Sequence, residues 1–472
     1  MANKFYITAA IPYVNAKPHI GHALEFVQTD TIHRYHKLLG EDSVSLSGGD
    51  ENALKNVQAA EEVKVPLQEF VDRNTELFRQ LAIALNAKFD FWQKGSDKKH
   101  YLSAQKLWKL CEKDIYKKKY EGLYCVGCEA FYAPEELNEN GECFEHPGKK
   151  LQRVAEDNYF FKLSKYQKDL TNLIQSDELK IVPESRKNEV LSFLKNPLQD
   201  ISISRTNERA KNWGVPVPGD STQRIYVWFD ALNIYQSGIG FGWNEEKYKK
   251  YWPADVHVIG KGIIRFHAVY WPAFLLSAGL KLPKSIFVHG YLTVNGQKMS
   301  KSVGNVVDPN EFIEKYGADA LRYYLLAKVS PFADGDFSEE KLKETYNADL
   351  ANGLGNTVAR VAKLCENENI KGINITPTRN DAIDISLKEF RFDLAISSIW
   401  DQVKFIDQRI NEEEPWKIKD KNELKERLET YVANILSLAS NLEPFLPETA
   451  EIIEKQFAGP KIKSGAPLFP RL

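Results

Sequence analysis

The sequence is short of cysteine, of net charge and of long apolar stretches, and each shortage excludes a class of protein. Five cysteines among 472 residues are an odd and small number, so the disulfide framework of a secreted protein is not expected. No apolar run approaches the roughly 18 residues that a membrane helix requires. The first six residues carry one charge and no hydrophobic signal core. We therefore expect a protein of the reducing cytoplasm with no membrane segment.

The remaining composition is that of an ordinary globular chain. Lys and Arg number 63 and Asp and Glu 65, and the net charge of −2 excludes a uniformly basic nucleic-acid coat but not a local basic face. Hydrophobic residues at 43% and charged residues at 27% exclude a disordered chain. At about 100–200 residues per domain, the length allows two to four domains.

The order of strand and helix patterns predicts a parallel sheet. Residues 4–10 are rich in β-formers, a helix is expected from Pro18–His22 to Gly40, and residues 43–48 form the next strand pattern. This strand–helix–strand order is typical of a βαβ unit. A helix is expected over 68–85, where only Asn74 interrupts the apolar stripe.

The strand patterns return only after a long interruption. We expect strands at 225–229, 256–259 and 286–288 and a helix at 264–278, whereas residues 116–225 lack this alternation and hold most of the cysteines. The sequence therefore predicts one α/β domain split by an insertion, with its first half at 1–115, the insertion at 116–225 and its second half at 226–340.

The last part of the chain has the pattern of a helix bundle. Apolar residues step by three and four through residues 392–410 and again through 424–442. Such stripes are typical of helices packed against one another. We therefore assign residues 341–472 to a separate helical domain.

Two short segments have the chemistry of a phosphate site. His19-Ile20-Gly21-His22 lies where the first strand pattern passes into the first helix, and a helix N-terminus attracts anions. Residues 296–304 form a Gly-flanked loop containing Lys298 and Lys301, two cations suited to a triphosphate. Either segment alone is typical of an exposed polar surface.

Together, His19–His22 and Lys298–Ser302 resemble the HIGH and KMSKS signatures of class I aminoacyl-tRNA synthetases. This resemblance implies a split Rossmann-like catalytic domain. It implies that His19, His22, Lys298 and Lys301 act in catalysis and that Gly21, Gly260 and His289 join them in binding ATP with Mg²⁺.

Several further segments resemble the methionyl-tRNA synthetase family. They include residues 8–15, 226–232, 266–267 and 289–296, and the similarity extends from about residue 4 to about residue 450. The resemblance implies a methionine—tRNA ligase, which forms methionyl-adenylate and pyrophosphate from methionine and ATP and then transfers methionyl to the 3′-terminal adenosine of tRNA(Met).

The same resemblance implies a methionine pocket in which Asp50 holds the ammonium group. Aromatic walls suit a polarizable thioether, by roughly 0.3–1.5 kcal/mol per contact. Gly262 stands where the family usually has an Asp, so the role of that carboxylate is in doubt here. The implied pocket consists of Ala10, Ile11, Tyr13, Asp50, Trp228, Ala231, Leu232, Tyr235, Ile263, Phe266 and His267.

The insertion contains a pattern typical of a metal site. Cys125-x-x-Cys128 and Cys143-x-x-His146 supply four ligands in two close pairs, which favours one tetrahedral Zn²⁺. Four protein ligands leave no position for water, so the zinc is expected to be structural. The pattern resembles the one-knuckle form of the family's insertion. Acidic residues around it argue against a DNA-binding zinc ribbon.

The helical domain resembles the family's anticodon-binding domain. Asn356 and Arg360 are one turn apart on one helix face, and Trp416 stands where the family stacks an aromatic ring on an anticodon base. The alternative interpretation makes Trp416 an apolar plug between helices. No protein partner is implied, and the absence of the dimerisation domain of some relatives leads us to expect a monomer.

Other functions stay open on the sequence alone. The nearest is a class I synthetase for another amino acid, such as cysteine or leucine. A tRNA-binding paralogue without catalysis is another, although the intact His19, His22, Lys298 and Lys301 argue against it. A dehydrogenase is disfavoured because the first βα junction lacks a G-x-G-x-x-G motif.

Overall fold

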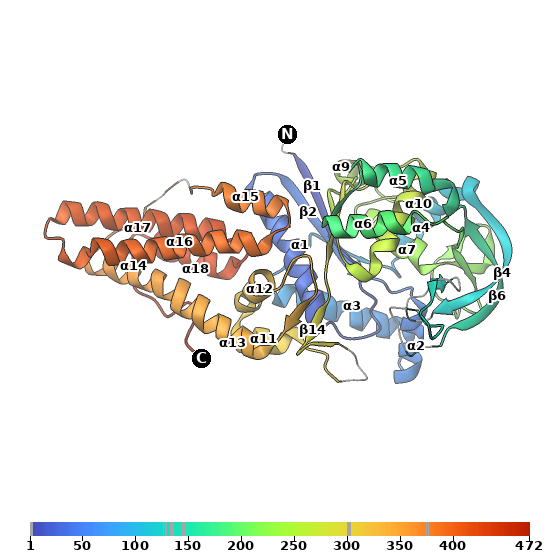
Figure 1. The fold of residues 1–472 in the computed structure, drawn as a ribbon, viewed down its shortest axis with the longest axis horizontal. Coiled ribbons are helices and arrows are strands. Elements are labelled where there is room, and N and C mark those ends of the chain that lie inside the picture. The colour runs from blue at the N-terminus through green and yellow to red at the C-terminus, as the bar shows by residue number, and fades with distance from the viewer. Residues whose placement is uncertain are drawn as a thin grey trace. The chain divides into compact units, whose positions relative to one another are not determined.

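The structure, a computed structural model, describes residues 3–125, 127, 130–132, 136–143, 148, 150–299, 304–373, 375 and 377–472. The chain forms two compact units (Figure 1). Unit 1 comprises Met1–Pro18, Leu39–Ala82 and Lys88–His289, and unit 2 comprises His19–Leu38, Ile83–Ala87 and Gly290–Leu472. The domain boundaries expected from the sequence stay predictions.

Unit 1 is built around a six-stranded parallel sheet, as the sequence predicts. Its order is β3 (Phe91–Lys94), β2 (Asp42–Gly49), β1 (Lys4–Ala9), β12 (Val256–Gly260), β13 (Ser285–His289) and β7 (Lys180–Val182). The chain builds outward from β1 to β2 and β3 on one side and from β12 to β13 on the other. The direction of winding therefore reverses between β1 and β12, and ligands of such sheets bind at this switch point.

The strands in the middle of the sheet are covered on both faces; β1 is nearly all apolar, whereas Ser43, Ser45 and Ser47 alternate with apolar residues along β2. In β1, all residues after Lys4 are buried, and in β2 all residues after Asp42 are buried. Near-continuous apolar strands are expected when both faces of a parallel sheet are covered. Unit 1 also contains α2 (Leu54–Val63), α3 (Leu67–Ala84, whose last two residues belong to unit 2), α4 (Lys98–Cys111), α9 (Glu245–Tyr251) and α10 (Trp271–Ala278).

The polar residue that interrupts the stripe of α3 has a structural role. Asn74 is buried, and its Nδ2 donates a hydrogen bond of 2.6 Å to the carbonyl oxygen of Val14. A buried amide is tolerated when it is hydrogen-bonded. Asn74 therefore attaches α3 to the segment that follows β1.

The predicted strand at 225–229 is wrong. Strand β11 (Asp220–Ile225) ends at Ile225, and residues 227–232 form α7 (Val227–Leu232), followed by α8 (Ile234–Ser237). All six residues of α7 are buried. A short apolar run gives the same signal for a buried strand and for a helix buried on all sides, so periodicity could not separate them.

The segment 116–225 carries two small antiparallel sheets. The longer one joins β5 (Ala130–Tyr132), β4 (Ile115–Cys125), β6 (Gln152–Phe161) and β8 (Ile201–Ser202), with β4 and β6 curving together (Figure 1). The other joins β10 (Pro216–Val217), β11 and β9 (Ser204–Thr206). Helices α5 (Gln167–Gln175) and α6 (Glu184–Phe193) flank β7, which pairs with β13 and so adds an edge strand to the main sheet.

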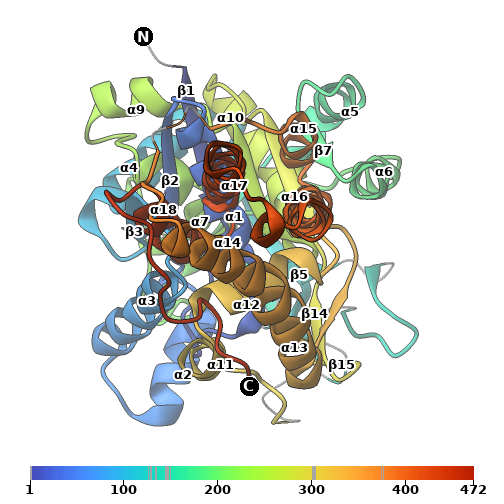
Figure 2. The same ribbon diagram turned by 90° about the vertical axis from the view of Figure 1, so that its left-hand side faces the viewer.

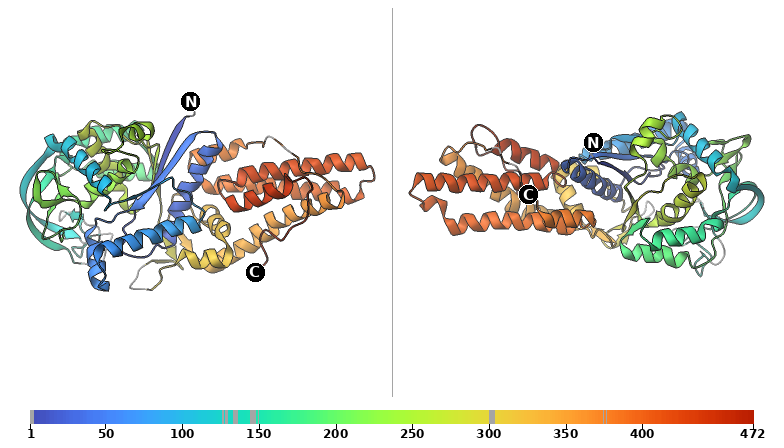
Figure 3. Two further views of the ribbon diagram at one scale, coloured as in Figure 1. Left: turned by 180° about the vertical axis from the view of Figure 1, so that it is seen from behind. Right: turned by 90° about the horizontal axis from the view of Figure 1, so that it is seen from above.

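Unit 2 contains α1 (Ile20–Leu38) and the helices of the last third of the chain. The apolar stripe predicted for residues 392–410 is buried in α16 (Phe392–Glu413). The stripe predicted for 424–442 is buried in α17 (Lys421–Leu442) from Leu428 onward, with Leu424 half-buried, which confirms the bundle. These two long helices lie side by side in Figures 1 and 3, and Figure 2 views the bundle along its length.

The remaining elements of unit 2 are short. They are α11 (Pro309–Tyr316), α12 (Ala318–Ala327), α13 (Glu339–Thr345), η6 (Tyr346–Gly355), α14 (Asn356–Asn367), α15 (Asp381–Lys388), η7 (Pro415–Lys417), α18 (Pro447–Phe457) and a sheet of β15 (Gln297–Lys298), β14 (Leu292–Val294) and β16 (Gly335–Phe337). Within the described ranges, no helix is both long and apolar enough to span a membrane.

Candidate active site

The carboxyl ends of four neighbouring strands carry residues of the predicted site. Ala10 follows β1, Asp50 follows β2, Gly260 ends β12 and His289 ends β13. Gly260 and His289 are register partners, and a Cβ on Gly260 would lie 3.5 Å from Cε1 of His289. The sheet thus brings four residues from distant parts of unit 1 to one edge, at the switch point.

Three aromatic residues of the predicted methionine pocket contact one another. The rings of Trp228 and Phe266 stack at 3.5 Å with an interplanar angle of 4°, and Tyr13 meets Trp228 edge-on at 6.1 Å. Trp228 comes from α7 and Phe266 from the π-helix η5 (Phe266–Tyr270), so two segments about forty residues apart form one wall.

A hydrogen-bond chain fixes the polar end of this cluster. His267 is buried, and its Nδ1 donates to the carbonyl oxygen of Ile263 at 2.9 Å. Its Nε2 therefore accepts the hydroxyl proton of Tyr235, at 2.7 Å, because a neutral imidazole has one donor and one acceptor. Burial lowers the pKa of His267 to about 4, so the imidazole is neutral at pH 7.

This neutral imidazole predicts a pH-dependent stability. The pKa of His267 lies near 6.5 when the chain is unfolded and at about 4 when it is folded, so its contribution is complete above pH 6.5 and is lost as the pH falls toward 4. For one group this amounts to about 2 kcal/mol of unfolding free energy by pH 5.

The measurement is urea unfolding of the wild type and of His267→Asn at pH 7.5 and pH 5. Carboxylates titrate alike in both proteins and cancel in the difference. We expect the stability advantage of the wild type to shrink by about 2 kcal/mol on acidification. An advantage that is equal at both pH values contradicts a neutral buried His267.

The remaining predicted pocket residues line the same core. Ala10, Ala231, Leu232 and Tyr235 are buried, and Ile11 and Ile263 pack against the cluster that contains them. The backbone of Asp50 is fixed by a hydrogen bond, because its N–H donates to the carbonyl of Pro12 at 2.9 Å. Asn56 Nδ2 donates to the Asp50 carbonyl at 2.7 Å. Unit 1 thus brings the predicted methionine residues together.

Sequence reasoning did not single out His257, which adjoins this network. It is fully buried on β12, its Nδ1 lies 2.7 Å from Thr8 Oγ1, and its ring is 4.4 Å from that of Tyr235. A histidine in the middle of an apolar strand pattern was the available signal, because such a strand buries both faces.

The two histidines of the first signature form a compact pair in unit 2. Their ring centroids are 3.9 Å apart, Gly21 N–H donates to His19 Nδ1 at 3.1 Å, and His19 N–H donates to His22 Nδ1 at 3.1 Å. Both Nδ1 atoms act as acceptors, which assigns the proton of each neutral ring to Nε2. Burial lowers the pKa of His19 to about 4, so this ring is a neutral N–H donor at pH 7.

The second signature begins in a β-hairpin of the same unit, since Lys298 is the last residue of β15. Strands β14 and β15 meet through Asn295 and Gly296, both with positive φ, as a two-residue hairpin turn requires. Met299 Cε lies 3.8 Å from the position that a Cβ on Gly21 would occupy, and Ile20 N–H donates to the carbonyl of Val307 at 3.1 Å.

Unit 2 therefore brings Met299 of the second signature next to Gly21 of the first, although the two residues are nearly 280 positions apart in the chain. Gly21 is needed at this contact, since a Cβ there would lie 3.0 Å from Cε1 of His19. The backbone of Lys298 pairs with Thr293, whereas Lys301 lies outside the described residues.

Half of the predicted zinc site can be examined. Cys125 ends β4, Cys143 lies 18 residues later, and both are buried with their Sγ atoms 3.2 Å apart. Cys128 and His146 lie outside the described residues. Among the residues that are described, no group of three metal-binding side chains occurs. Two adjacent buried thiols fit one end of a tetrahedral site.

The predicted anticodon residues occur at one end of the bundle. Arg360, on α14, forms an ion pair with Asp407 and donates from Nη2 to Asn411 Oδ1 at 2.7 Å, both near the end of α16. Asn356 is exposed one turn earlier, and Trp416 follows α16 directly. Trp416 is 57% exposed, so the interpretation of this residue as an apolar plug is wrong.

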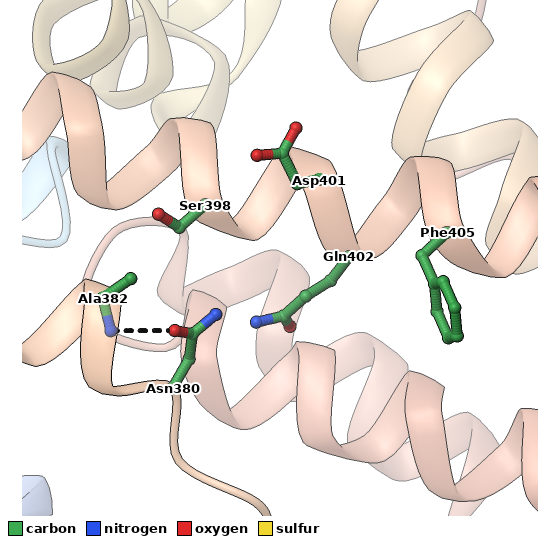
Figure 4. Close-up of a pocket in the computed structure, with 6 residues that line it drawn as sticks. All are labelled: Asn380, Ala382, Ser398, Asp401, Gln402 and Phe405. Carbon is green, nitrogen blue, oxygen red and sulfur yellow. Dashed lines mark hydrogen bonds between the residues drawn. The ribbon is translucent and has the colours of Figure 1, made fainter.

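A separate recess lies on unit 2 between the start of α15 and the middle of α16 (Figure 4). Asn380 Oδ1 accepts the N–H of Ala382 at 2.9 Å and so caps α15. The other lining residues are Ser398, Asp401, Gln402 and Phe405. None of the residues predicted from the sequence lines it.

Known proteins similar to this chain identify its family. The family of tRNA synthetases class I (M) matches residues 5–362. Methionine—tRNA ligase of Brucella suis is 39% identical, covering 99% of this chain and 98% of that protein, and the Thermotoga maritima enzyme is 40% identical, covering 95% and 74%. The solved structure of Mycobacterium tuberculosis methionyl-tRNA synthetase in complex with methionyl-adenylate is similar over 100% of this chain and 99% of that one, with a TM-score of 0.88 and 35% identity. The chain therefore belongs to the class I (M) family of tRNA synthetases.

Proposed function

We propose that the chain is a methionine—tRNA ligase with ATP, methionine and tRNA(Met) as substrates. The observation that carries the proposal is the aromatic cluster at the switch point of the sheet, closed by the Tyr235–His267 hydrogen bond. A flat aromatic wall suits the thioether of methionine, and Asp50 at the end of β2 supplies a carboxylate for its ammonium group. The relative from Mycobacterium tuberculosis was solved with methionyl-adenylate.

The first step needs charge stabilisation more than a protein nucleophile. The methionine carboxylate oxygen attacks the α-phosphorus of ATP, and the bond to pyrophosphate breaks. The Nε2–H groups of His19 and His22 donate to phosphate oxygens whose charge grows during the attack, and Lys298 and Lys301 neutralise the leaving pyrophosphate. Gly21, Gly260 and His289 complete the ATP site. Mg²⁺ bound with ATP supplies further positive charge to the phosphates.

In the second step, the 3′-terminal ribose hydroxyl of tRNA attacks the carbonyl of the adenylate. The mixed anhydride bond breaks and AMP leaves with its electrons. Since the hydroxyl proton passes to the released phosphate or to water, no Ser–His dyad is required. At the other end of the tRNA, Asn356 and Arg360 read unstacked anticodon bases and the exposed Trp416 stacks on one of them.

The test is ATP–pyrophosphate exchange with each of the twenty amino acids, followed by aminoacylation of tRNA(Met). Exchange with methionine above all others, together with charging, is the expected result. Exchange with leucine or cysteine instead would indicate another class I synthetase. Binding of tRNA without any exchange would indicate a silent paralogue.

We also propose that Cys125, Cys128, Cys143 and His146 hold one structural zinc ion. The contact of the two buried thiols Cys125 and Cys143 supports this proposal. The purified protein should contain one zinc per chain, measured by elemental analysis, and Cys125→Ser should lower this ratio. Cys365→Ser, which removes a buried thiol of unit 2, is the matched control. A zinc content unaffected by Cys125→Ser would place the metal elsewhere.

Cytoplasmic location and a monomeric state stay predictions.

A further inference from the structure

Unit 1 contains a second recess, lined by two arginines that the proposed chemistry does not use. Arg205 and Arg209 contribute their guanidinium groups, and Tyr124, Trp213 and Tyr226 contribute aromatic rings. Arginine beside aromatic rings is the combination with which proteins bind unpaired nucleic acid strands.

Arg209 holds a positive charge whose donors are incompletely used. Its Nε and Nη2 are buried, and neither has a hydrogen-bond partner among the described residues. The nearest carboxylate oxygen, Glu156 Oε1, is 3.6 Å from Nε, beyond hydrogen-bond length. Glu156 in turn accepts a hydrogen bond from Asn158 at 3.0 Å. Burial is the main cause that lowers the pKa of Arg209, and the nearby Arg205 lowers it further.

Arg205 adds a second, better fixed charge. It is 6% exposed, its Nη1 donates to Ser202 Oγ at 3.0 Å and to the Ser204 carbonyl at 2.7 Å, and its guanidinium lies 4.2 Å from the centre of the Tyr226 ring. Its register partner on β11 is Arg224. Two arginines therefore line one recess, and Glu156 is the acidic side chain near Arg209. The buried N–H groups of Arg209 that have no hydrogen-bond partner among the described residues favour an anion.

The recess adjoins the methionine site through the chain itself. Asn52 and Leu54 line it and follow Asp50, and Tyr226 and Val227 line it and directly precede Trp228. Asn52 also donates to Asp230 Oδ2 at 2.6 Å, which connects the two segments. An anion held here therefore lies next to the bound amino acid.

We propose that Arg209, supported by Arg205, binds a backbone phosphate of the unpaired 3′ end of tRNA during methionyl transfer. The inference rests on the proposed function. A guanidinium matches a phosphodiester with two parallel hydrogen bonds, and Arg209 has buried N–H groups to offer. The contact would hold the strand next to the adenylate, so Arg209 is a positioning residue for the second step.

The test separates the two steps of the reaction. Arg209→Gln is compared with Arg79→Gln, which removes an exposed arginine of α3 that pairs with Glu76. ATP–pyrophosphate exchange measures the first step, and single-turnover transfer from preformed methionyl-adenylate measures the second. We expect Arg209→Gln to leave exchange within twofold and to lower kcat/KM for tRNA by about tenfold, with Arg79→Gln unchanged in both.

Salt dependence distinguishes a phosphate contact from a structural role. The slope of log kcat/KM for tRNA against log salt concentration should fall by about 0.7 in Arg209→Gln, the value for one single-strand phosphate. Arg209→Lys, which keeps the charge without the planar fork, should restore the slope and only part of the rate. It also serves as the test if the glutamine variant does not fold.

Three results would overturn the inference. An equal loss in exchange and transfer would mean that the recess binds a phosphate of ATP or the carboxylate of methionine. Unchanged transfer would exclude tRNA contact at Arg209. A slower transfer with an unchanged salt slope would indicate a structural role. Each differs from failure of the proposed function, in which the wild type itself lacks methionine-dependent exchange.

Discussion

His22→Asn should form methionyl-adenylate about 10²–10³-fold more slowly than the wild type, the usual effect of removing one donor that stabilises transition-state charge. His22 Nδ1 accepts the N–H of His19, which leaves the Nε2–H as its donor to phosphate. The Asn side-chain oxygen can replace Nδ1 as the acceptor but does not reach the Nε2 position. His22→Gln extends its amide to that position and should therefore retain more activity than the shorter variant.

The measurement is methionine-dependent ATP–pyrophosphate exchange at saturating substrate, with the dissociation constant of methionine determined separately. Methionine affinity should change little in both variants, because the residues proposed to bind methionine belong to unit 1 and His22 belongs to unit 2. If Asn preserved the rate and Gln abolished it, the Nδ1 acceptor rather than the Nε2–H would be the important atom, and the assigned proton position would be wrong.

The central strands of the parallel sheet could be predicted from the sequence, because β1 is rich in β-formers and β2 ends in Gly48-Gly49 before Asp50. β1 and β2 bury nearly every residue and are bounded by turn residues, so their positions follow from composition alone. β7 has three residues and no comparable signal; it is a strand because β13 offers it an edge. Short elements of this kind depend on tertiary contacts that local sequence does not encode.

The two π-helices could not be predicted either, although both coincide with predicted functional segments. η5 contains Phe266 and His267 of the predicted methionine pocket, and η6 (Tyr346–Gly355) precedes α14, which carries the predicted anticodon residues Asn356 and Arg360. A π-helix changes the angle between successive side chains by a small amount that a periodicity of 3.6 does not detect, and such segments are frequent at functional sites.

Site residues that belong to a sequence motif could be predicted. Residues that only the three-dimensional structure brings to a site could not. His19 and His22 stand in a signature, but their proton positions require the hydrogen bonds to Nδ1. Arg209 belongs to no motif in the sequence analysis. The role proposed for Arg209 follows from its position beside the ring of Tyr124 and next to Arg205 in the recess. Tyr124 is distant in the sequence, so only the structure shows this contact.

The largest stability effect is expected at Arg322, which connects three segments of unit 2. Its side chain is fully buried. Its Nη1 pairs with Asp30 Oδ2 of α1 at 2.7 Å, its Nε donates to the Phe445 carbonyl at 2.7 Å and its Nη2 donates to the Pro444 carbonyl at 2.9 Å. Nη1 also donates to the Leu85 carbonyl at 3.2 Å. Every side of the guanidinium is thus bonded within the protein.

Arg322→Met fills a similar volume but removes all of these donors. The pair of Asp30 with Arg34 Nε, at 2.8 Å, is kept, whereas the pair with Arg322 and the hydrogen bonds from its guanidinium to three carbonyls are lost. Breaking a buried ion pair by removing one partner costs about 3–5 kcal/mol, because the groups that it bonded stay buried with fewer partners. We expect this loss in the unfolding free energy of unit 2, measured by urea titration followed by far-ultraviolet circular dichroism.

Arg391→Met is the matched control, because Arg391 pairs with Asp393 at the surface of the same unit, with 32% of its side chain exposed. A surface pair contributes about 0–1 kcal/mol, so this variant should unfold almost as the wild type does. Equal losses for Arg322→Met and Arg391→Met would contradict the role of Arg322 as a buried connection between these segments.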